Sequence, residues 1–112
     1  MKHAPLTREA LLHRLQKALP YLRRRFGVMR LSLYGFFAQD TANRTSDVDL
    51  LVELSRPLGL EFVALAQYLE RKLGRRVDLA TFETLRRSHS MPKYQKMAAR
   101  IQESLIDVQE AA

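Results

Sequence analysis

The sequence predicts an α+β fold in which a small mixed sheet is flanked by helices. Three segments carry apolar residues at the spacing of a helix, and three short segments between them have the apolar pattern of strands. The predicted order is helix, strand, strand, helix, strand, helix, which suits a sheet covered by helices. The chain has 112 residues, 46% of them hydrophobic. We therefore expect one domain over residues 1–112.

The first predicted helix covers about residues 7–26. Its apolar residues recur every three or four positions, at Leu11, Leu12, Leu15, Leu19, Leu22 and Phe26. Thr7 has a side chain suited to capping the first turn, and Gly27 suits the end of a helix. Pro20 lacks an N–H group, so it should kink this helix or divide it.

Two strands are predicted next, over residues 28–35 and 47–54. In the first strand Leu31 and Leu33 alternate with polar residues, as expected when only one face is buried. The second strand has an apolar face formed by Val48, Leu50 and Val52. Residues 36–46 between the strands are mostly polar and turn-forming, so we expect a loop there.

The second half of the chain predicts a helix, a strand and a helix. Residues 62–73 carry an apolar stripe that ends at Gly74, a good helix stop. Residues 75–81 form the third predicted strand. A loop then leads to a final helix over about residues 93–108, whose apolar stripe fits either the core or a partner interface.

Charge and composition narrow the function classes. The net charge is +7, but it is uneven: residues 1–30 carry +7, residues 31–70 carry −4 and residues 71–112 carry +4. Acidic residues gathered in a basic protein indicate metal chemistry or a solvated face. The absence of cysteine excludes disulfides, cysteine zinc sites and thiol catalysis. No apolar run approaches the roughly 20 residues of a membrane span, so we expect a cytoplasmic protein without a membrane partner.

Three aspartates on predicted strands are the candidate site residues. Asp47 and Asp49 are separated by one residue, so both side chains leave the same face of their strand. Asp78 lies on the third strand and would join them if the two strands are adjacent. Such a cluster suits one or two Mg²⁺ ions in phosphoryl transfer. The alternative is that Asp47 caps or closes a turn, and that Asp49 and Asp78 are only solvated strand residues.

The run LYGFFAQDTANRTSDVDLLVEL, residues 33–54, resembles the signature of the DNA polymerase β-type nucleotidyltransferase superfamily. That signature is Gly-Ser, ten residues and then Asp-x-Asp, and here Gly35 has the same spacing to Asp47 and Asp49. The later segment RRVDLAT resembles the strand that carries the third carboxylate, at Asp78. The sequence is similar in particular to the minimal nucleotidyltransferases, which are antitoxins of HEPN-domain toxins.

The resemblance implies a polymerase β-like nucleotidyltransferase fold and a Mg²⁺-dependent activity. AMP would be transferred from ATP, with release of pyrophosphate, to a hydroxyl (a tyrosine in particular) of a HEPN ribonuclease toxin, which is thereby silenced. Asp47, Asp49 and Asp78 would be the catalytic residues and would hold two Mg²⁺ ions. Gly35 and Phe36 would lie at the phosphates of ATP.

The sequence departs from the family pattern beside Gly35. Phe36 stands where the family has Ser, and Ala38, Gln39 and Asp40 stand where it often has Ala-Arg-Gly. A hydroxyl and a positive charge are thereby missing from the implied phosphate site. The alternative hypothesis is therefore an antitoxin with an impaired site that neutralises its toxin by binding. We rank nucleic-acid binding last, because no aromatic-basic or helix-turn-helix pattern accompanies the positive charge.

Overall fold

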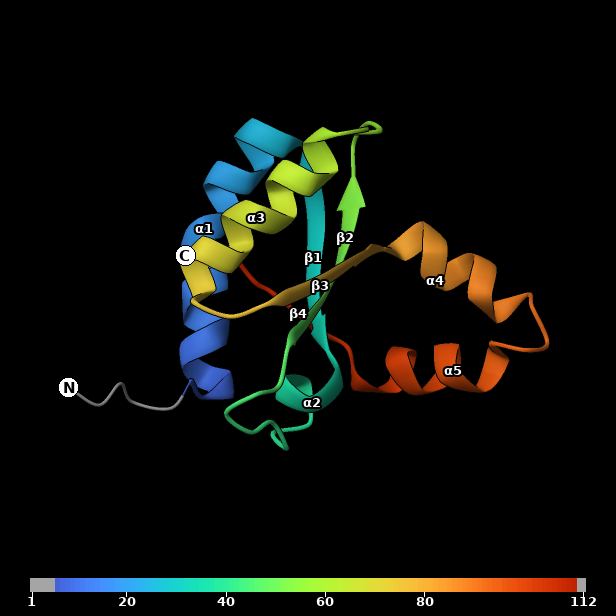
Figure 1. The fold of residues 1–112 in the computed structure, drawn as a ribbon. Coiled ribbons are helices and arrows are strands. Elements are labelled where there is room, and N and C mark those ends of the chain that lie inside the picture. The colour runs from blue at the N-terminus through green and yellow to red at the C-terminus, as the bar shows by residue number, and fades with distance from the viewer. Residues whose placement is uncertain (1–5, 111–112) are drawn as a thin grey trace.

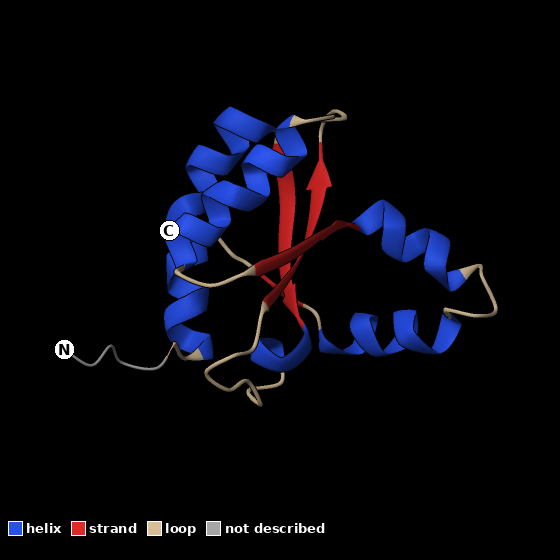
Figure 2. Cartoon of the chain, in the orientation of Figure 1, coloured by secondary structure: helices blue, strands red, loops and turns tan. Residues whose placement is uncertain are grey.

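The computed structural model describes residues 6–110, which form a four-stranded sheet with helices on both faces (Figures 1 and 2). The elements in chain order are α1 (Arg8–Phe26), β1 (Val28–Tyr34), α2 (Gly35–Ala38), β2 (Val48–Leu54), α3 (Glu61–Leu73), β3 (Val77–Thr81), α4 (Phe82–His89), α5 (Gln95–Ser104) and β4 (Ile106–Asp107). The predicted α+β class is confirmed.

The sheet has the strand order β3-β2-β1-β4 and is mixed, as predicted. β1 is antiparallel to both β2 and β4, whereas β2 and β3 are parallel because the chain crosses back through α3 between them. In this topology the C-terminal end of β1 and the N-terminal ends of β2 and β3 lie at the same end of the sheet. The candidate site residues lie at that end of the strands.

The larger core lies between one face of the sheet and the helices α1 and α3, which lie side by side (Figure 1). The residues of the first two strands predicted to face this core are buried, with at most 1% of their surface exposed: Leu31, Leu33, Val48, Leu50 and Val52. Thr7 caps α1 by accepting a hydrogen bond from the Ala10 N–H at 3.0 Å, and Gly27 ends α1 in the left-handed conformation. Both caps were predicted from the sequence.

Pro20 does not divide α1, which continues to Phe26, so that part of the prediction is wrong. Pro20 lies on the exposed side of the helix. Buried residues on both sides of it, Leu15, Leu19 and Leu22, pack into the same core. Their burial outweighs the one backbone hydrogen bond that proline removes.

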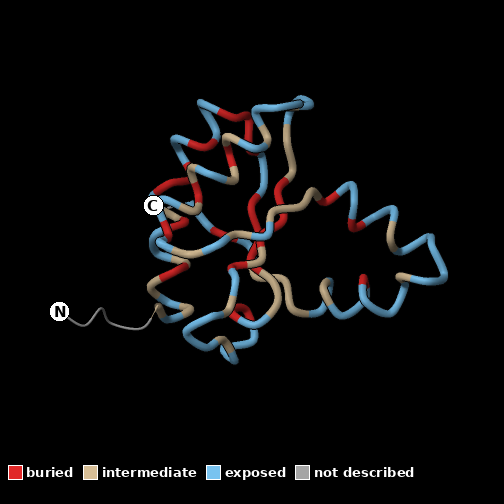
Figure 3. Tube along the Cα trace, viewed as in Figure 1, coloured by how far each residue is buried: buried red, intermediate tan, exposed pale blue. Residues whose placement is uncertain are grey.

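A second, smaller core covers the opposite face of the sheet. It consists of Leu51, Phe82, Leu85 and Ala98, from β2, α4 and α5. These two helices form a hairpin that extends away from the rest of the fold and is exposed over most of its surface (Figure 3). Because each face of the sheet carries a core, the middle of β1 is buried on both faces. Ser32 is therefore fully buried, although an exposed residue was expected there. Its hydroxyl donates a hydrogen bond to Asp107 of β4.

Three local predictions need correction. Gly35–Ala38 forms the short helix α2, which begins at the last residue of the predicted strand and continues into the predicted loop, anchored by the buried ring of Phe37. Phe82–His89 forms α4 where a loop was expected. The last helix ends at Ser104, and Ile106 and Asp107 pair with β1 as β4 instead of continuing the helix. Within residues 6–110, no helix is long and apolar enough to cross a membrane.

Candidate active site

Gly35 is the first residue of α2, directly after β1, and it faces the carboxylate of Asp49. Its φ is 74°, a left-handed conformation that side chains other than glycine rarely adopt. A Cβ at this position would overlap Asp49 Oδ2 and would lie 3.1 Å from Asp49 Cγ. Glycine is therefore required here for two reasons: the turn that starts α2, and the approach of the backbone to the carboxylate.

The pairing of strands brings Asp49 and Asp78 together. Asp49 of β2 is in register with Asp78 of β3 on one side and with Tyr34 of β1 on the other. Adjacent strands are about 4.8 Å apart, so the two carboxylates leave neighbouring positions of the sheet. The predicted cluster required the strands of Asp49 and Asp78 to be neighbours, and β2 and β3 are neighbours.

Within residues 6–110, neither Asp49 nor Asp78 takes part in an ion pair. Burial, followed by the charges of Asp78 and Asp47, raises the pKa of Asp49 from 3.8 to about 6. Burial, followed by Asp78 and Asp49, raises the pKa of Tyr34 to about 12. A site that disfavours the ionised form of Asp49 is one where a bound cation gains free energy.

Asp47 precedes β2 by one residue and is exposed, at the end of the loop that follows α2. This loop is held by Arg75, whose Nη1 donates to the carbonyl oxygens of Asn43 at 3.0 Å and Ser46 at 3.1 Å. The contact of Arg75 with the loop depends on the tertiary structure, and no sequence signal points to it.

Phe36, at the second position of α2, is 61% exposed and points away from the core that Phe37 fills. Gln39 follows at the end of α2. Asp40 has a φ of 61°, so it occupies the left-handed conformation for which a glycine is suited. Asp40 therefore has a conformation that glycine adopts easily, at the position where the family pattern often has Gly.

A cavity of about 740 Å³ opens between the α4–α5 hairpin and the end of the sheet that carries Asp49 and Asp78. Its residues come from both sides: Tyr34, Gly35, Phe36, Gln39, Asp49, Leu51, Asp78 and Ala80 from the sheet side, and Thr84, Leu85, Ser88, Met97, Ala98, Arg100, Ile101 and Ser104 from the hairpin. Such a volume is typical of small-molecule sites. Of the predicted site residues, only Asp47 does not line it.

The donor set is suitable for Mg²⁺, which prefers carboxylate oxygens. Asp49 and Asp78 supply oxygens from neighbouring strands, and both line the cavity. Over residues 6–110, no three Asp, Glu or His side chains lie close enough together to form a metal site in this structure.

The fold and this site define a nucleotidyltransferase, and the chain belongs to the nucleotidyltransferase domain family, whose profile matches residues 15–108. The chain is 42% identical over 66 residues to the protein adenylyltransferase MntA of Thermococcus cleftensis, which is 58% of this chain and 67% of that protein. The resemblance to minimal nucleotidyltransferases and the assignment as a nucleotidyltransferase enzyme are thus confirmed at the level of the family.

Solved structures agree on the fold. A protein provisionally described as a minimal nucleotidyltransferase has a TM-score of 0.66 and 26% identity, over 93% of this chain and 98% of that one. A toxin–antitoxin complex with AMP-PNP has a TM-score of 0.61 and 22% identity, over 86% of this chain and 73% of the matched one. The second similarity concerns the fold alone.

Proposed function

We propose that this protein transfers AMP from ATP to a hydroxyl, that of a tyrosine in particular, on a HEPN-domain toxin, and that it acts as the antitoxin. The observation that carries the proposal is Gly35 packed against Asp49, with Asp78 in register beside it, at the wall of a cavity of nucleotide size. The relationship to a protein adenylyltransferase supports the choice of AMP and of a protein acceptor.

The proposed transfer forms a bond between the acceptor oxygen and the α-phosphorus of ATP. The bond from that phosphorus to the oxygen bridging to the β-phosphate breaks, and its electron pair leaves with pyrophosphate. The proton of the acceptor hydroxyl passes to Asp78 and then to water. Mg²⁺, when bound, supplies the positive charge that this chemistry needs at the nucleophile and at the leaving group.

The other proposed roles, metal binding, phosphate binding and support of the loop, belong to separate residues of this chain. Asp49 and Asp78, which line the cavity, are proposed ligands of the Mg²⁺ ions. Asp47 is proposed to join them when an ion is bound, because the three side chains are not gathered in this structure. Gly35 lets the backbone N–H groups at the start of α2 approach the phosphates, because no side chain intervenes. Arg75 keeps the loop before Asp47 in place.

The direct test is to incubate the purified protein with ATP labelled at the α-phosphate, Mg²⁺ and the folded toxin encoded beside it. We expect label on the toxin, and no label when EDTA replaces Mg²⁺ or when Asp49→Asn replaces the wild type. Glu103→Gln removes an exposed carboxylate that does not line the cavity and should label as the wild type does. An unlabelled toxin in the wild-type reaction would exclude the transferase activity.

Phe36 favours a second candidate function, in which the protein neutralises its toxin by binding alone. An exposed aromatic ring stands at the cavity where the family has a small hydroxyl. Under this hypothesis an Asp47→Asn, Asp49→Asn double variant still protects cells from the toxin. Under the transferase hypothesis it does not, and Phe36→Ser raises the labelling rate.

A further inference from the structure

We infer that Arg100 of α5 binds the polyphosphate chain of the nucleotide, from the helical wall of the cavity that faces the carboxylates of the sheet. This inference rests on the proposed adenylyltransferase function and adds a binding residue that neither the motif nor its spacing indicates. Arg100 lies 51 residues beyond Asp49 and outside the segment that resembles the family signature.

Arg100 is the only basic residue among those that line the cavity in the described part of the chain. The position at which the family often has an arginine is occupied here by Gln39, which lines the same cavity without a charge. Asp49 and Asp78 contribute negative charge to it. A triphosphate entering this cavity therefore meets one cationic side chain of the protein, and that side chain comes from the hairpin.

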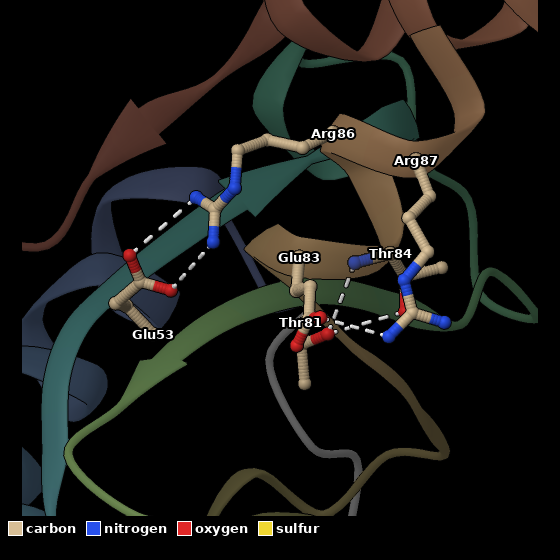
Figure 4. Close-up of polar contacts among 6 residues, drawn as sticks. All are labelled: Glu53, Thr81, Glu83, Thr84, Arg86 and Arg87. Carbon is tan, nitrogen blue, oxygen red and sulfur yellow. Dashed lines mark hydrogen bonds and ion pairs between the residues drawn. The ribbon is translucent and has the colours of Figure 1, made fainter. Parts of the chain in front are cut away.

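The other arginines of the hairpin are already paired (Figure 4). Arg86 contacts the carboxylate of Glu53 at 3.5 Å, and Arg87 donates to Glu83 Oε1 at 2.8 Å. Within residues 6–110, no ion pair involves Arg100. Its guanidinium is therefore available to a ligand.

Two hydroxyl groups on the hairpin wall, those of Ser88 and Ser104, are less suited to an anion. Ser88 donates its hydroxyl hydrogen to the carbonyl oxygen of Thr84 at 2.9 Å, and Ser104 donates to that of Ile101 at 3.1 Å. Each hydroxyl has one hydrogen, so neither can also donate to a phosphate without breaking this bond. Arg100 carries five N–H donors in a planar arrangement that matches two phosphate oxygens.

The chemistry of the proposed reaction explains why a cation is needed on this wall. The electron pair of the broken phosphorus–oxygen bond leaves with pyrophosphate, so negative charge grows on the β- and γ-phosphates. The α2 segment offers backbone N–H groups but no cationic side chain. A guanidinium on the facing wall would hold the polyphosphate in place and stabilise the departing charge.

The test compares Arg100→Gln, Arg100→Lys and Lys96→Gln with the wild type. Lys96→Gln removes one positive charge from the same helix at an exposed position that does not line the cavity. Affinity for ATP with Mg²⁺ is measured by titration calorimetry, and affinity for AMP by competition with a fluorescent ATP analogue. We expect Arg100→Gln to weaken ATP binding roughly tenfold to a hundredfold, the usual effect of losing a charged hydrogen bond.

The same variant should change AMP binding by less than about twofold, because AMP lacks the polyphosphate. Arg100→Lys should recover part of the ATP affinity, and Lys96→Gln should leave it unchanged. The inference is overturned if Arg100→Gln binds ATP as the wild type does, if ATP and AMP weaken equally, or if Lys96→Gln has the same effect. These outcomes leave the proposed function standing, whereas a wild-type protein that binds no ATP would remove the proposed function itself.

Discussion

Replacing Asp49 by asparagine should stabilise the folded protein while it abolishes the transfer activity. The carboxyl group of Asp49 is half-buried between Tyr34 and Asp78, and its pKa rises from 3.8 to about 6. An acid whose pKa is raised by folding is penalised in the folded state when it is ionised. Its contribution therefore destabilises the protein near pH 7 and disappears as the pH falls through about 6 towards 3.8.

The magnitude follows from the size of the pKa change. Raising the pKa of Asp49 from 3.8 to about 6 corresponds to about 3 kcal/mol if the whole change acts on the folding equilibrium. Water reaches Asp49 and screens the neighbouring charges, so we reduce the expected effect to about 1 kcal/mol. Asparagine has nearly the same shape and carries no charge. The free energy of unfolding of Asp49→Asn should therefore exceed that of the wild type by about 1 kcal/mol at pH 7.5.

The assay is urea unfolding followed by circular dichroism, in EDTA, at pH 7.5 and again near pH 4. The stability difference should be present at the higher pH and should shrink at the lower one, where Asp49 of the wild type is protonated. Mg²⁺ in place of EDTA should stabilise the wild type more than the variant, because the variant lacks one carboxylate ligand. Glu103→Gln serves as the matched loss of an exposed carboxylate and should follow the wild type.

Two results would refute this reasoning. If Asp49→Asn is less stable than the wild type at pH 7.5, the carboxylate makes a favourable contact that outweighs its burial. If the difference in unfolding free energy is the same at both pH values, it does not come from the ionisation of Asp49.

Three further predictions follow from the same structure. Gly35→Ala should lower the free energy of unfolding by more than the roughly 1–2 kcal/mol of left-handed strain, because the added Cβ also meets the carboxylate of Asp49. In Gly74→Ala, where φ is 67° and the added Cβ has no atom within 4 Å, only the strain should appear. Equal urea midpoints for the two variants would contradict this prediction. Arg75→Met should reduce kcat for AMP transfer while changing the free energy of unfolding little, because the loop before Asp47 loses two hydrogen bonds. Arg76→Met removes the same charge from an exposed side chain and should keep the wild-type rate. Ser32→Ala should cost about 1–2 kcal/mol by removing a buried hydrogen bond, and an unchanged melting temperature would count against it.

The parts of the fold with strong periodicity were predictable. α1 carries a long apolar stripe between two recognisable end signals, and α3 carries one that stops at Gly74, so their bounds are close to the predicted ones. α4 was missed because its eight residues contain only two apolar positions, Phe82 and Leu85. β4 was missed because Leu105 and Val108, on either side of it, continue the helical spacing of the apolar residues of α5. The strand conformation of Ile106 and Asp107 depends on pairing with β1, about 75 residues earlier.

The candidate site divides in the same way. Gly35 and Asp49 could be predicted because their spacing is local in sequence and belongs to a known pattern. The position of Asp78 next to Asp49 required β2 and β3 to be neighbours, which the sequence allowed but did not require. The contacts of Arg75 and the position of Arg100 depend on how the loop and the hairpin pack. Single side chains outside the motif carry no periodic signal of such packing.

The position of β3 at one edge of the sheet has a consequence for motion at the site. Asp49 lies on an interior strand held from both sides, whereas Asp78 lies on a strand bonded to β2 alone within the described sheet. Edge strands open more often than interior ones, so the backbone amides of β3 should exchange with deuterium faster than those of β2. A ligand that joins Asp78 to Asp49 would slow this exchange. Protection of β3 would thus report occupancy of the site without any measurement of turnover.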